Sequence, residues 1–112
     1  MSELKLQAEC FQDFWNRYPE KRGLLFMNYN NPKNAAHGAI LKGLGLVAGV
    51  ADMTYLAPEG AVFLEFKFGK GRQAPAQKKW QEAVEAVGYR YFLIYTKKNF
   101  TDALHLVDKS VY

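Results

Sequence analysis

Two carboxylates and a lysine in the middle of the chain have a spacing that suits a metal site. Glu65 and Lys67 are two residues apart, so on a strand their side chains project from the same face. Asp52 precedes a turn signal at residues 58–60, and a hairpin there returns Asp52 to the edge that holds Glu65. Two such carboxylates repel each other unless a divalent cation lies between them, and oxygen ligands suit Mg²⁺ or Mn²⁺. The spacing therefore predicts a metal centre at which Lys67 holds a water or offsets charge on a phosphate.

The same strand has a simpler interpretation. If Leu64, Phe66 and Phe68 face a core, Glu65 and Lys67 lie on a solvated face, as in many half-exposed strands. Spacing alone does not choose between a metal centre and a solvated face, so both interpretations stand at this point.

A basic, glycine-rich loop at residues 69–73 follows this strand directly. Its glycines let the backbone approach a phosphate, while Lys70 and Arg72 neutralise the phosphate charge. Lys78 continues the basic stretch, in a chain whose formal net charge of +4 suits a polyanionic partner. The loop predicts a DNA contact, and the alternative is a surface turn with incidental positive charge.

The first element that must support these residues is a helix predicted at residues 3–17. Apolar residues recur there at spacings of three and four, and Pro19 helps to end the helix. The residues expected on its buried face are Leu4, Ala8, Phe11, Trp15 and Tyr18. Cys10 is the only cysteine, so we expect it to pack and not to form a disulfide or a zinc site.

The later elements follow from apolar runs and turn signals. Strands are predicted at residues 24–29, 52–57, 61–68 and 90–96, a helix at 75–87 and a short helix at 35–44. A last helix is expected to begin at an Asn99 or Thr101 cap and to continue to about Val107. The order αβ(α)ββαβα predicts an α/β fold in which helices flank a mixed central sheet.

Composition sets outer limits on the protein. A chain of 112 residues that is 49% hydrophobic can close one core, so we expect a single domain over residues 1–112. The longest apolar stretches, such as residues 44–51 and 91–95, are far shorter than the roughly 20 residues that span a bilayer. The charged N-terminus does not suit a signal peptide, so we expect no membrane contact and an intracellular protein.

The ordered motifs resemble those of the VRR-NUC branch of the PD-(D/E)xK nuclease superfamily. These motifs are Gly49-Val50-Ala51-Asp52, a hairpin, Glu65-Phe66-Lys67, the basic loop, Ala76-Gln77-Lys78-Lys79-Trp80 and Gly88-Tyr89. The Glu-x-Lys triplet is unspecific by itself, but the ordered set covers almost the whole chain. Ala51 stands where the family usually has proline, a residue that shapes backbone and does no chemistry. The resemblance implies the restriction-endonuclease-like core of that superfamily.

The resemblance also implies roles for individual residues. In the family, the Asp before the hairpin and the Glu of the triplet bind the metal, which here are Asp52 and Glu65. The main-chain carbonyl of Phe66 is a further expected ligand. The family's catalytic lysine corresponds to Lys67, which positions the attacking water, and Gln77 is expected to orient Lys67 or the substrate phosphate.

The family tends to supply one more glutamate from its first helix, and here Glu3 and Glu9 compete. On a helical wheel of about 100° per residue, Glu9 falls nearly opposite the Phe11 and Trp15 face, whereas Glu3 lies nearer its border. We therefore expect Glu3 to be the metal ligand. The alternative for Glu3 is a solvated glutamate in a first turn, where it suits the helix dipole.

A second polar patch resembles the asparagine-bearing loop of the family. It consists of Asn30, Asn31, Lys33, Asn34 and His37. Asn31 and Lys33 are expected to contact backbone phosphates or sugars. No zinc site is predicted, because His37 has no His or Cys neighbour.

The resemblance implies metal-dependent hydrolysis of phosphodiester bonds in DNA. By similarity to stand-alone members of this size, we expect branched DNA such as a four-way (Holliday) junction to be cut by a homodimer. The expected location is the cytoplasm of a bacterium or of a phage-infected host cell. One rival is a catalytically silent module that binds DNA or protein, although such a module has no reason to keep two adjacent carboxylates. The other rival, an RNA-directed nuclease, stays open.

Overall fold

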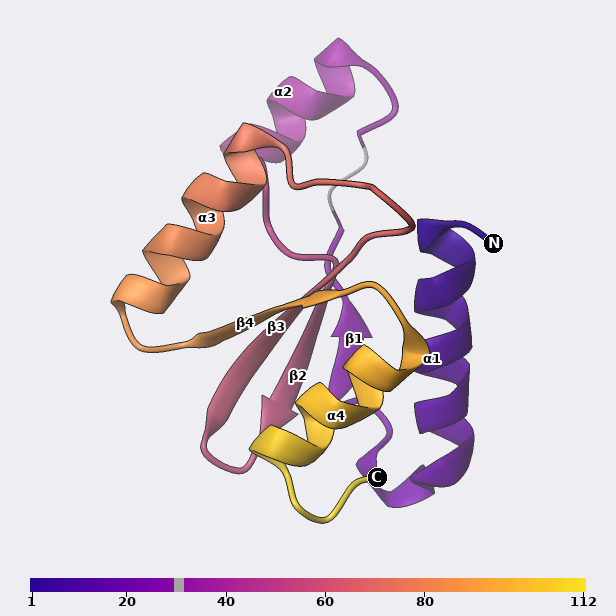
Figure 1. Ribbon diagram of the computed structural model, residues 1–112. Coiled ribbons are helices and arrows are strands. Elements are labelled where there is room, and N and C mark those ends of the chain that lie inside the picture. The colour runs from indigo at the N-terminus through magenta and orange to yellow at the C-terminus, as the bar shows by residue number, and fades with distance from the viewer. Residues whose placement is uncertain (30–31) are drawn as a thin grey trace.

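A four-stranded mixed sheet forms the centre of the protein in a computed structural model that describes residues 1–29 and 32–112 (Figure 1). The strands lie in the order β1 (Leu25–Met27), β2 (Met53–Ala57), β3 (Gly60–Phe66) and β4 (Arg90–Ile94). β1 pairs antiparallel with β2 and β2 with β3, whereas β3 and β4 are parallel. The predicted mixed sheet is therefore confirmed.

Helices cover both faces of this sheet. They are α1 (Glu3–Arg17), α2 (Ala35–Gly43), α3 (Pro75–Ala86) and α4 (Lys97–Val107), with a short 3₁₀ helix, η1, at Pro19–Lys21. Alternate residues of β3 point to opposite faces, because Phe66 contacts Phe100 of α4 while Phe63 contacts Trp80 of α3. α1 packs against α4 and β3, so α1 and α4 share the Phe66 face and α3 covers the other. Among the helices of residues 1–29 and 32–112, none has the length and apolar character of a membrane span.

The β2–β3 hairpin sets the register of the central strands. Its turn at Pro58-Glu59-Gly60 uses a glycine with φ of 145°, a backbone conformation that side chains disfavour. Met53 pairs with Leu64, which brings Asp52 opposite Glu65. Glu65 lies two residues after Phe63 on β3, so its side chain points to the same face of the sheet, the one that α3 covers.

The predicted buried face of α1 is wrong in part, because Phe11 and Tyr18 pack partly buried against the core but Leu4, Ala8 and Trp15 are exposed. Leu6, Cys10 and Phe14 are buried in the core, whereas Leu4 is 76% exposed and Trp15 is 40% exposed. The helix carries two apolar stripes at helical spacing, and the one containing Cys10 packs on the sheet. Cys10 thus packs as expected, and burial raises the pKa of its thiol to about 12, which keeps it protonated at neutral pH.

The predicted cap of the last helix is also wrong. Strand β4 ends at Ile94, and α4 begins at Lys97 with Thr96 as its N-cap. The Thr96 hydroxyl accepts a hydrogen bond from the Asn99 N–H over 3.0 Å. Asn99 instead turns its side-chain oxygen back to the Tyr95 N–H, so it closes the turn that Thr96 caps.

Candidate active site

Asp52 and Glu65 bring their carboxyl groups together where β2 begins and β3 ends. Asp52 Oδ2 accepts a hydrogen bond from the main-chain N–H of Phe66 over 2.7 Å, which fixes the carboxylate against β3. The two carboxyl groups are close enough for each to shift the pKa of the other. Glu65 is only 1% exposed and Lys67 only 6%, so the interpretation of a solvated face is wrong.

Burial and mutual repulsion disfavour charge on this pair. Burial is the largest cause that raises the pKa of Glu65 to about 8, and the neighbouring charge of Asp52 adds to it. Burial also raises the pKa of Asp52, although the Phe66 N–H opposes that rise. The two groups therefore share a proton near neutral pH. A divalent cation would replace that proton and let both carboxylates ionise, so the donor set fits Mg²⁺ or Mn²⁺.

Gln77 links Glu65 to Lys67. Its side-chain Nε2 donates to Glu65 Oε2 over 2.8 Å, and its Oε1 accepts from Lys67 Nζ over 3.0 Å. Lys67 Nζ also lies 3.7 Å from Glu65 Oε2. The three side chains thus form one hydrogen-bonded unit in which the carboxylate and the ammonium are both held by a single amide.

The start of α3 fixes where Gln77 can reach. Gln77 Oε1 accepts a second hydrogen bond from the Ala74 N–H over 2.7 Å, so the amide caps its own helix. Gly49 lies directly against this turn with φ of 85°, and a Cβ atom there would lie 2.2 Å from the Ala76 carbonyl oxygen. The backbone of this loop therefore approaches the first turn of α3 so closely that only glycine fits at position 49. Because Asp52 follows three residues later, one loop positions Asp52 and supports Gln77.

Two residues beside this unit were not found from the sequence. The Tyr91 hydroxyl lies 3.5 Å from Glu65 Oε1, and Gln73 Nε2 donates to that hydroxyl over 3.3 Å. Gln73 is in turn held by Gln81 of α3 over 2.8 Å. Tyr91 belongs to an apolar run that reads as core, and only the parallel pairing of β3 with β4 brings it to Glu65. The sequence signal that could have found Tyr91 is the alternation of side chains along β4, which puts Tyr91 on the face that α3 covers.

The structure separates the two glutamates of α1. The Glu3 carboxylate lies against the 69–73 loop near Gly71, and its charge contributes to the raised pKa of Glu65. Glu9 instead faces Lys97 of α4 at 4.0 Å. Glu3 is therefore the helix glutamate on the side of Asp52 and Glu65.

The candidate metal ligands supply few atoms by themselves. Among residues 1–29 and 32–112, no group of three or more His, Cys, Asp or Glu side chains is close enough to hold a metal ion. Phe66 lies beside the carboxylate pair, since its N–H donates to Asp52. Mg²⁺ commonly keeps several waters and takes only one or two protein carboxylates, which is the number found here.

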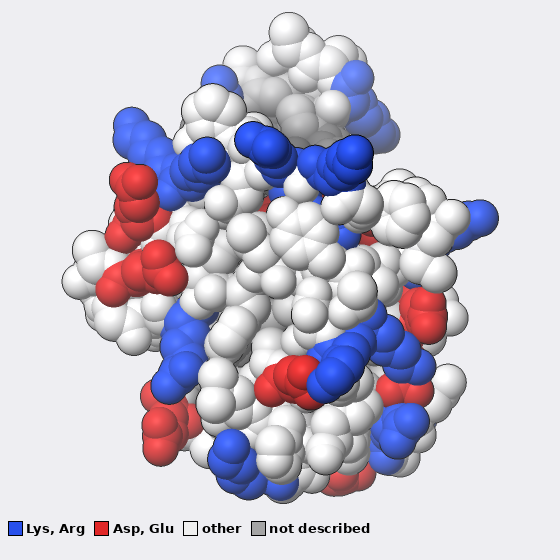
Figure 2. Space-filling model, viewed as in Figure 1, with Lys and Arg blue, Asp and Glu red and all other residues white. Residues whose placement is uncertain are grey.

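The predicted DNA contacts lie on the surface around this unit. Lys70 and Arg72 are exposed in the loop after β3, and Lys78 is exposed on the first turns of α3. Within the described part of the chain, none of the three forms an ion pair. Figure 2 shows Lys and Arg side chains gathered over this upper part of the molecule.

The second polar patch is described only in part. Lys33 is exposed, and its main-chain N–H donates to His37 Nδ1 over 2.9 Å. The His37 N–H is in turn capped by the Asn34 side chain over 2.8 Å, so both residues serve the start of α2. The predicted contacts at Asn30 and Asn31 fall outside the described residues.

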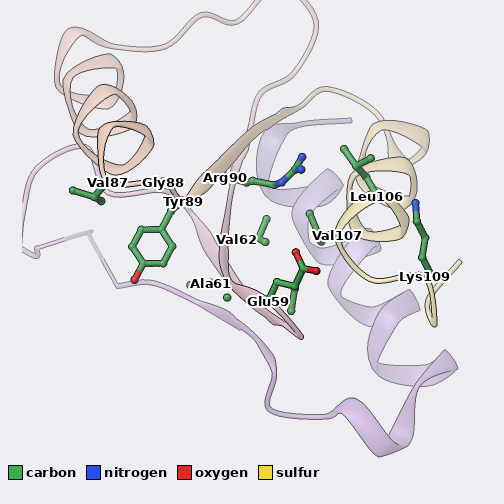
Figure 3. Close-up of a pocket in the computed structure, with 12 residues that line it drawn as sticks. Glu59, Ala61, Val62, Val87, Gly88, Tyr89, Arg90, Leu106, Val107 and Lys109 are labelled. Carbon is green, nitrogen blue, oxygen red and sulfur yellow. The ribbon is translucent and has the colours of Figure 1, made fainter.

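A separate cavity of about 510 Å³ lies at the other end of the sheet (Figure 3). The β2–β3 turn, the start of β4 and the end of α4 line it, with Glu59, Arg90 and Lys109 as its charged residues. None of the predicted site residues that the structure describes lines this cavity. The candidate active site is thus a polar edge of the sheet and not this pocket.

The comparisons with known proteins bear on the fold. No family model matches the sequence, and no curated protein matches it. A solved structure described as a "VRR_NUC domain protein" is similar, with a TM-score of 0.68 over 96% of this chain and 88% of that chain. The sequence identity is 18%, so the likeness concerns the fold. It confirms the predicted α/β fold with a mixed sheet, which this chain shares with that VRR_NUC domain protein.

Proposed function

We propose that this chain, with the fold of a VRR_NUC domain protein, is a metal-dependent nuclease that hydrolyses phosphodiester bonds in DNA. The observation that carries the proposal is the pair formed by half-buried Asp52 and buried Glu65, with Lys67 3.7 Å from Glu65. Two carboxyl groups held together away from water are costly for folding unless they bind a cation. A module that only binds DNA or protein gains nothing from that cost.

The metal site would be built from Asp52, Glu65 and the main-chain carbonyl of Phe66, while Glu3 lies nearby against the 69–73 loop and would complete the site only by moving closer to this pair. The chemistry that Mg²⁺ or Mn²⁺ supplies in such a site is polarisation of a phosphoryl oxygen and a lowered pKa of coordinated water. The observed hydrogen bond from Phe66 N–H to Asp52 keeps one carboxylate in place before any ligand binds.

Lys67 acts on the attacking water and on the phosphate. Its ammonium is held by Gln77 over 3.0 Å, so it donates in a fixed direction near Glu65. A hydrogen bond from Lys67 positions the water, and the positive charge offsets the negative charge that builds up on the phosphate. Gln77 is a positioning residue, because it holds both Glu65 and Lys67 and is itself fixed by Ala74.

DNA would bind to the basic surface beside the candidate active site. The exposed side chains of Lys70, Arg72 and Lys78 lie on the loop and helix that follow the catalytic strand. They would neutralise phosphates on either side of the scissile bond, and Asn31 and Lys33 would add contacts from the segment before α2.

The preferred substrate we propose is branched DNA such as a four-way junction. A 112-residue domain offers too little surface to grip two duplex arms, so a homodimer with one site per strand would carry out the paired cuts. The reaction would take place in the cytoplasm of a bacterium or of a phage-infected cell.

A cleavage assay across substrates tests this function. Labelled four-way junction, duplex DNA, single-stranded DNA and RNA are incubated with the protein in Mg²⁺, Mn²⁺ or EDTA. The expected result is cleavage of the junction with either metal, none in EDTA and none by Asp52→Asn. Binding of DNA without cleavage in both metals would favour a binding module, and preferential cleavage of RNA would favour the RNA-directed alternative.

A further inference from the structure

Both carboxyl oxygens of Glu65 have a partner. Gln77 Nε2 donates to Oε2 over 2.8 Å, and the Tyr91 hydroxyl lies 3.5 Å from Oε1. The two partners come from different elements, since Gln77 is on the first turn of α3 and Tyr91 is on β4. A carboxylate with a partner on each oxygen is restrained from rotating about its last bond. The orientation of Glu65 is therefore set by β4 as well as by α3.

Tyr91 itself is held firmly in place. It is buried, and its ring lies against the Trp80 indole of α3 with 6.1 Å between the ring centroids. The parallel pairing of β3 with β4 sets Tyr91 opposite Phe63, two residues before Glu65 on the same face of the sheet. Burying a phenol costs free energy unless its hydroxyl is hydrogen-bonded, and the partners that this hydroxyl has are Glu65 and Gln73.

Gln73 fixes the direction in which the Tyr91 hydroxyl donates. The amide nitrogen of Gln73 can only donate, so its contact with the phenol oxygen over 3.3 Å makes that oxygen the acceptor. The single hydroxyl proton is then free to point at Glu65 Oε1. The 3.5 Å separation is long for a bond between two oxygens, but a carboxylate that ligates a cation carries the full charge that shortens such bonds. The order of donation is thus from Gln73 to Tyr91 to Glu65.

We propose that Tyr91 is a positioning residue for the metal ligand Glu65. Its hydroxyl would hold Oε1 while Gln77 holds Oε2, so that the carboxylate meets the cation in one orientation. Hydrogen-bond partners of this kind orient metal ligands and raise their affinity for the metal. The inference rests on the proposed function, because Tyr91 has this task only if Asp52 and Glu65 bind a metal.

The same contacts connect the basic loop after β3 to the carboxyl pair. Gln73 is the last residue of that loop, and it contacts Tyr91. Earlier in the loop, the Gly71 carbonyl accepts a hydrogen bond from the Tyr95 hydroxyl over 3.0 Å. Two tyrosines four residues apart thus hold one loop, and of the two it is Tyr91 that reaches the carboxyl pair. Tyr95 therefore offers a matched comparison for Tyr91.

Calorimetric titration of Mn²⁺ into the metal-free protein, without DNA, tests the role of Tyr91. Tyr91→Phe removes the hydroxyl and keeps the ring that packs against Trp80. The expected result is about tenfold weaker binding of Mn²⁺ with an unchanged stoichiometry. A variant that was merely misfolded in part would instead bind with a lower stoichiometry and the wild-type affinity, and circular dichroism would report the loss of helix. Wild-type affinity for Mn²⁺ in folded Tyr91→Phe would overturn the proposal.

Tyr95→Phe is the matched control, because it makes the same chemical change directly after β4 and removes a contact to the same loop. It should bind Mn²⁺ with the wild-type affinity. If Tyr95→Phe weakened Mn²⁺ binding as much as Tyr91→Phe, the attachment of the loop would control the site. The contact between Tyr91 and Glu65 would then have no role of its own, and the proposal would be wrong.

Cleavage assays separate orientation of the metal ligand from DNA binding. In Tyr91→Phe, the Mn²⁺ concentration that gives half-maximal cleavage should rise by the same factor as the dissociation constant for Mn²⁺. The dissociation constant for DNA should not change, and saturating Mn²⁺ should restore most of the single-turnover rate. A low rate at saturating Mn²⁺ with an unchanged half-maximal concentration would contradict the proposed role, because the metal ligand would then be correctly placed without the hydroxyl.

Gln73→Ala is a second variant that leaves every fully buried side chain in place, since Gln73 is only half-buried. Without its donor, the Tyr91 hydroxyl is free to turn away from Glu65. The affinity for Mn²⁺ should therefore fall in the same direction as in Tyr91→Phe and by a smaller factor. If Tyr91→Phe does not fold, this variant decides the question, and an unchanged affinity for Mn²⁺ in Gln73→Ala would overturn the proposal.

Failure of this inference and failure of the proposed function give different results. If the wild type takes up no Mn²⁺ and cuts no DNA, the metal centre is wrong, and the role of Tyr91 is wrong with it. If the wild type binds Mn²⁺ and cuts DNA while Tyr91→Phe matches it in both measurements, the nuclease stands and only the role of Tyr91 is wrong.

Discussion

The side-chain amide of Gln77 lies 2.8 Å from the Glu65 carboxylate and donates a hydrogen bond to it. The same amide accepts a hydrogen bond from Lys67, the residue that follows β3. The first turn of α3 therefore holds the Glu65 carboxylate and the Lys67 ammonium in fixed positions relative to each other. The candidate active site is thus assembled by a hairpin and a crossover helix together. Either element alone leaves it incomplete.

Gln77→Ala should therefore reduce cleavage without weakening DNA binding. Loss of a residue that orients a metal ligand costs about 10–100-fold in metal affinity or activity. Single-turnover cleavage at saturating DNA should fall by that factor while the dissociation constant for DNA stays the same. Gln81→Ala, four residues further along α3, is the control, because Gln81 contacts Gln73 and not Glu65 or Lys67. An unchanged cleavage rate in Gln77→Ala would remove Gln77 from the site.

The pKa of Glu65 predicts an unusual dependence of stability on pH. The folded protein raises this pKa from 4.5 to about 8, so folding favours the protonated form. Below pH 4.5 the residue is protonated in both states and imposes no penalty. As the pH rises toward 8, the unfolded chain loses the proton first, so stability in EDTA should fall across that interval.

Thermal unfolding in EDTA between pH 5 and pH 8 measures this effect. Glu65→Gln should flatten the profile and melt at a higher temperature than the wild type at the upper end of the range. Mg²⁺ should stabilise the wild type most at that same end and leave Glu65→Gln unchanged. A wild type that becomes more stable as the pH rises would contradict the raised pKa.

Gly49→Ala should disrupt the contact between the Gly49 loop and α3. The added Cβ would meet the Ala76 carbonyl oxygen at 2.2 Å, at a position where φ is already 85°. We expect a loss of about 2 kcal/mol or more in the free energy of unfolding, together with reduced cleavage. Gly45→Ala is the matched control, since Gly45 also has a positive φ, of 110°, but a Cβ there meets no atom within 4 Å. Equal losses in the two variants would mean that the contact with α3 contributes nothing.

The loop after β3 should bind DNA mainly through charge. Replacement of both Lys70 and Arg72 by alanine should weaken binding at every sequence and reduce the slope of log affinity against log salt by about 2. Fluorescence anisotropy at several salt concentrations measures both quantities. Lys109→Ala, at the far end of the sheet, should change neither. A double variant with the wild-type slope would place the DNA elsewhere.

Periodicity and turn signals predicted the order of the elements because those signals are local. The hairpin turn at residues 58–60 fixed the register that brings Asp52 to Glu65. The predicted buried face of α1 was wrong in part because Trp15 and Phe14 belong to two stripes of equal spacing, and only tertiary packing chooses between them.

The parts of the candidate site that the sequence did not predict depend on contacts between segments that are distant in the chain. Tyr91 was not predicted because its proximity to Glu65 depends on the parallel pairing of β3 with β4, which no local pattern encodes. Gln73 was not predicted because it is linked to Glu65 only through the Tyr91 hydroxyl. The alternating pattern of the strand likewise did not predict the near-complete burial of Lys67, because α3 and the end of β4 bury it.

The central claim is that Asp52 and Glu65 form a metal centre, and calorimetric titration of Mn²⁺ into the metal-free protein at neutral pH tests it most directly. The wild type should bind with a measurable heat, Asp52→Asn should not bind, and Lys67→Ala should bind the metal but cut no DNA. If the wild type takes up no Mn²⁺, or if Asp52→Asn binds it equally well, then Asp52 and Glu65 are not a metal centre and the proposed nuclease mechanism is wrong.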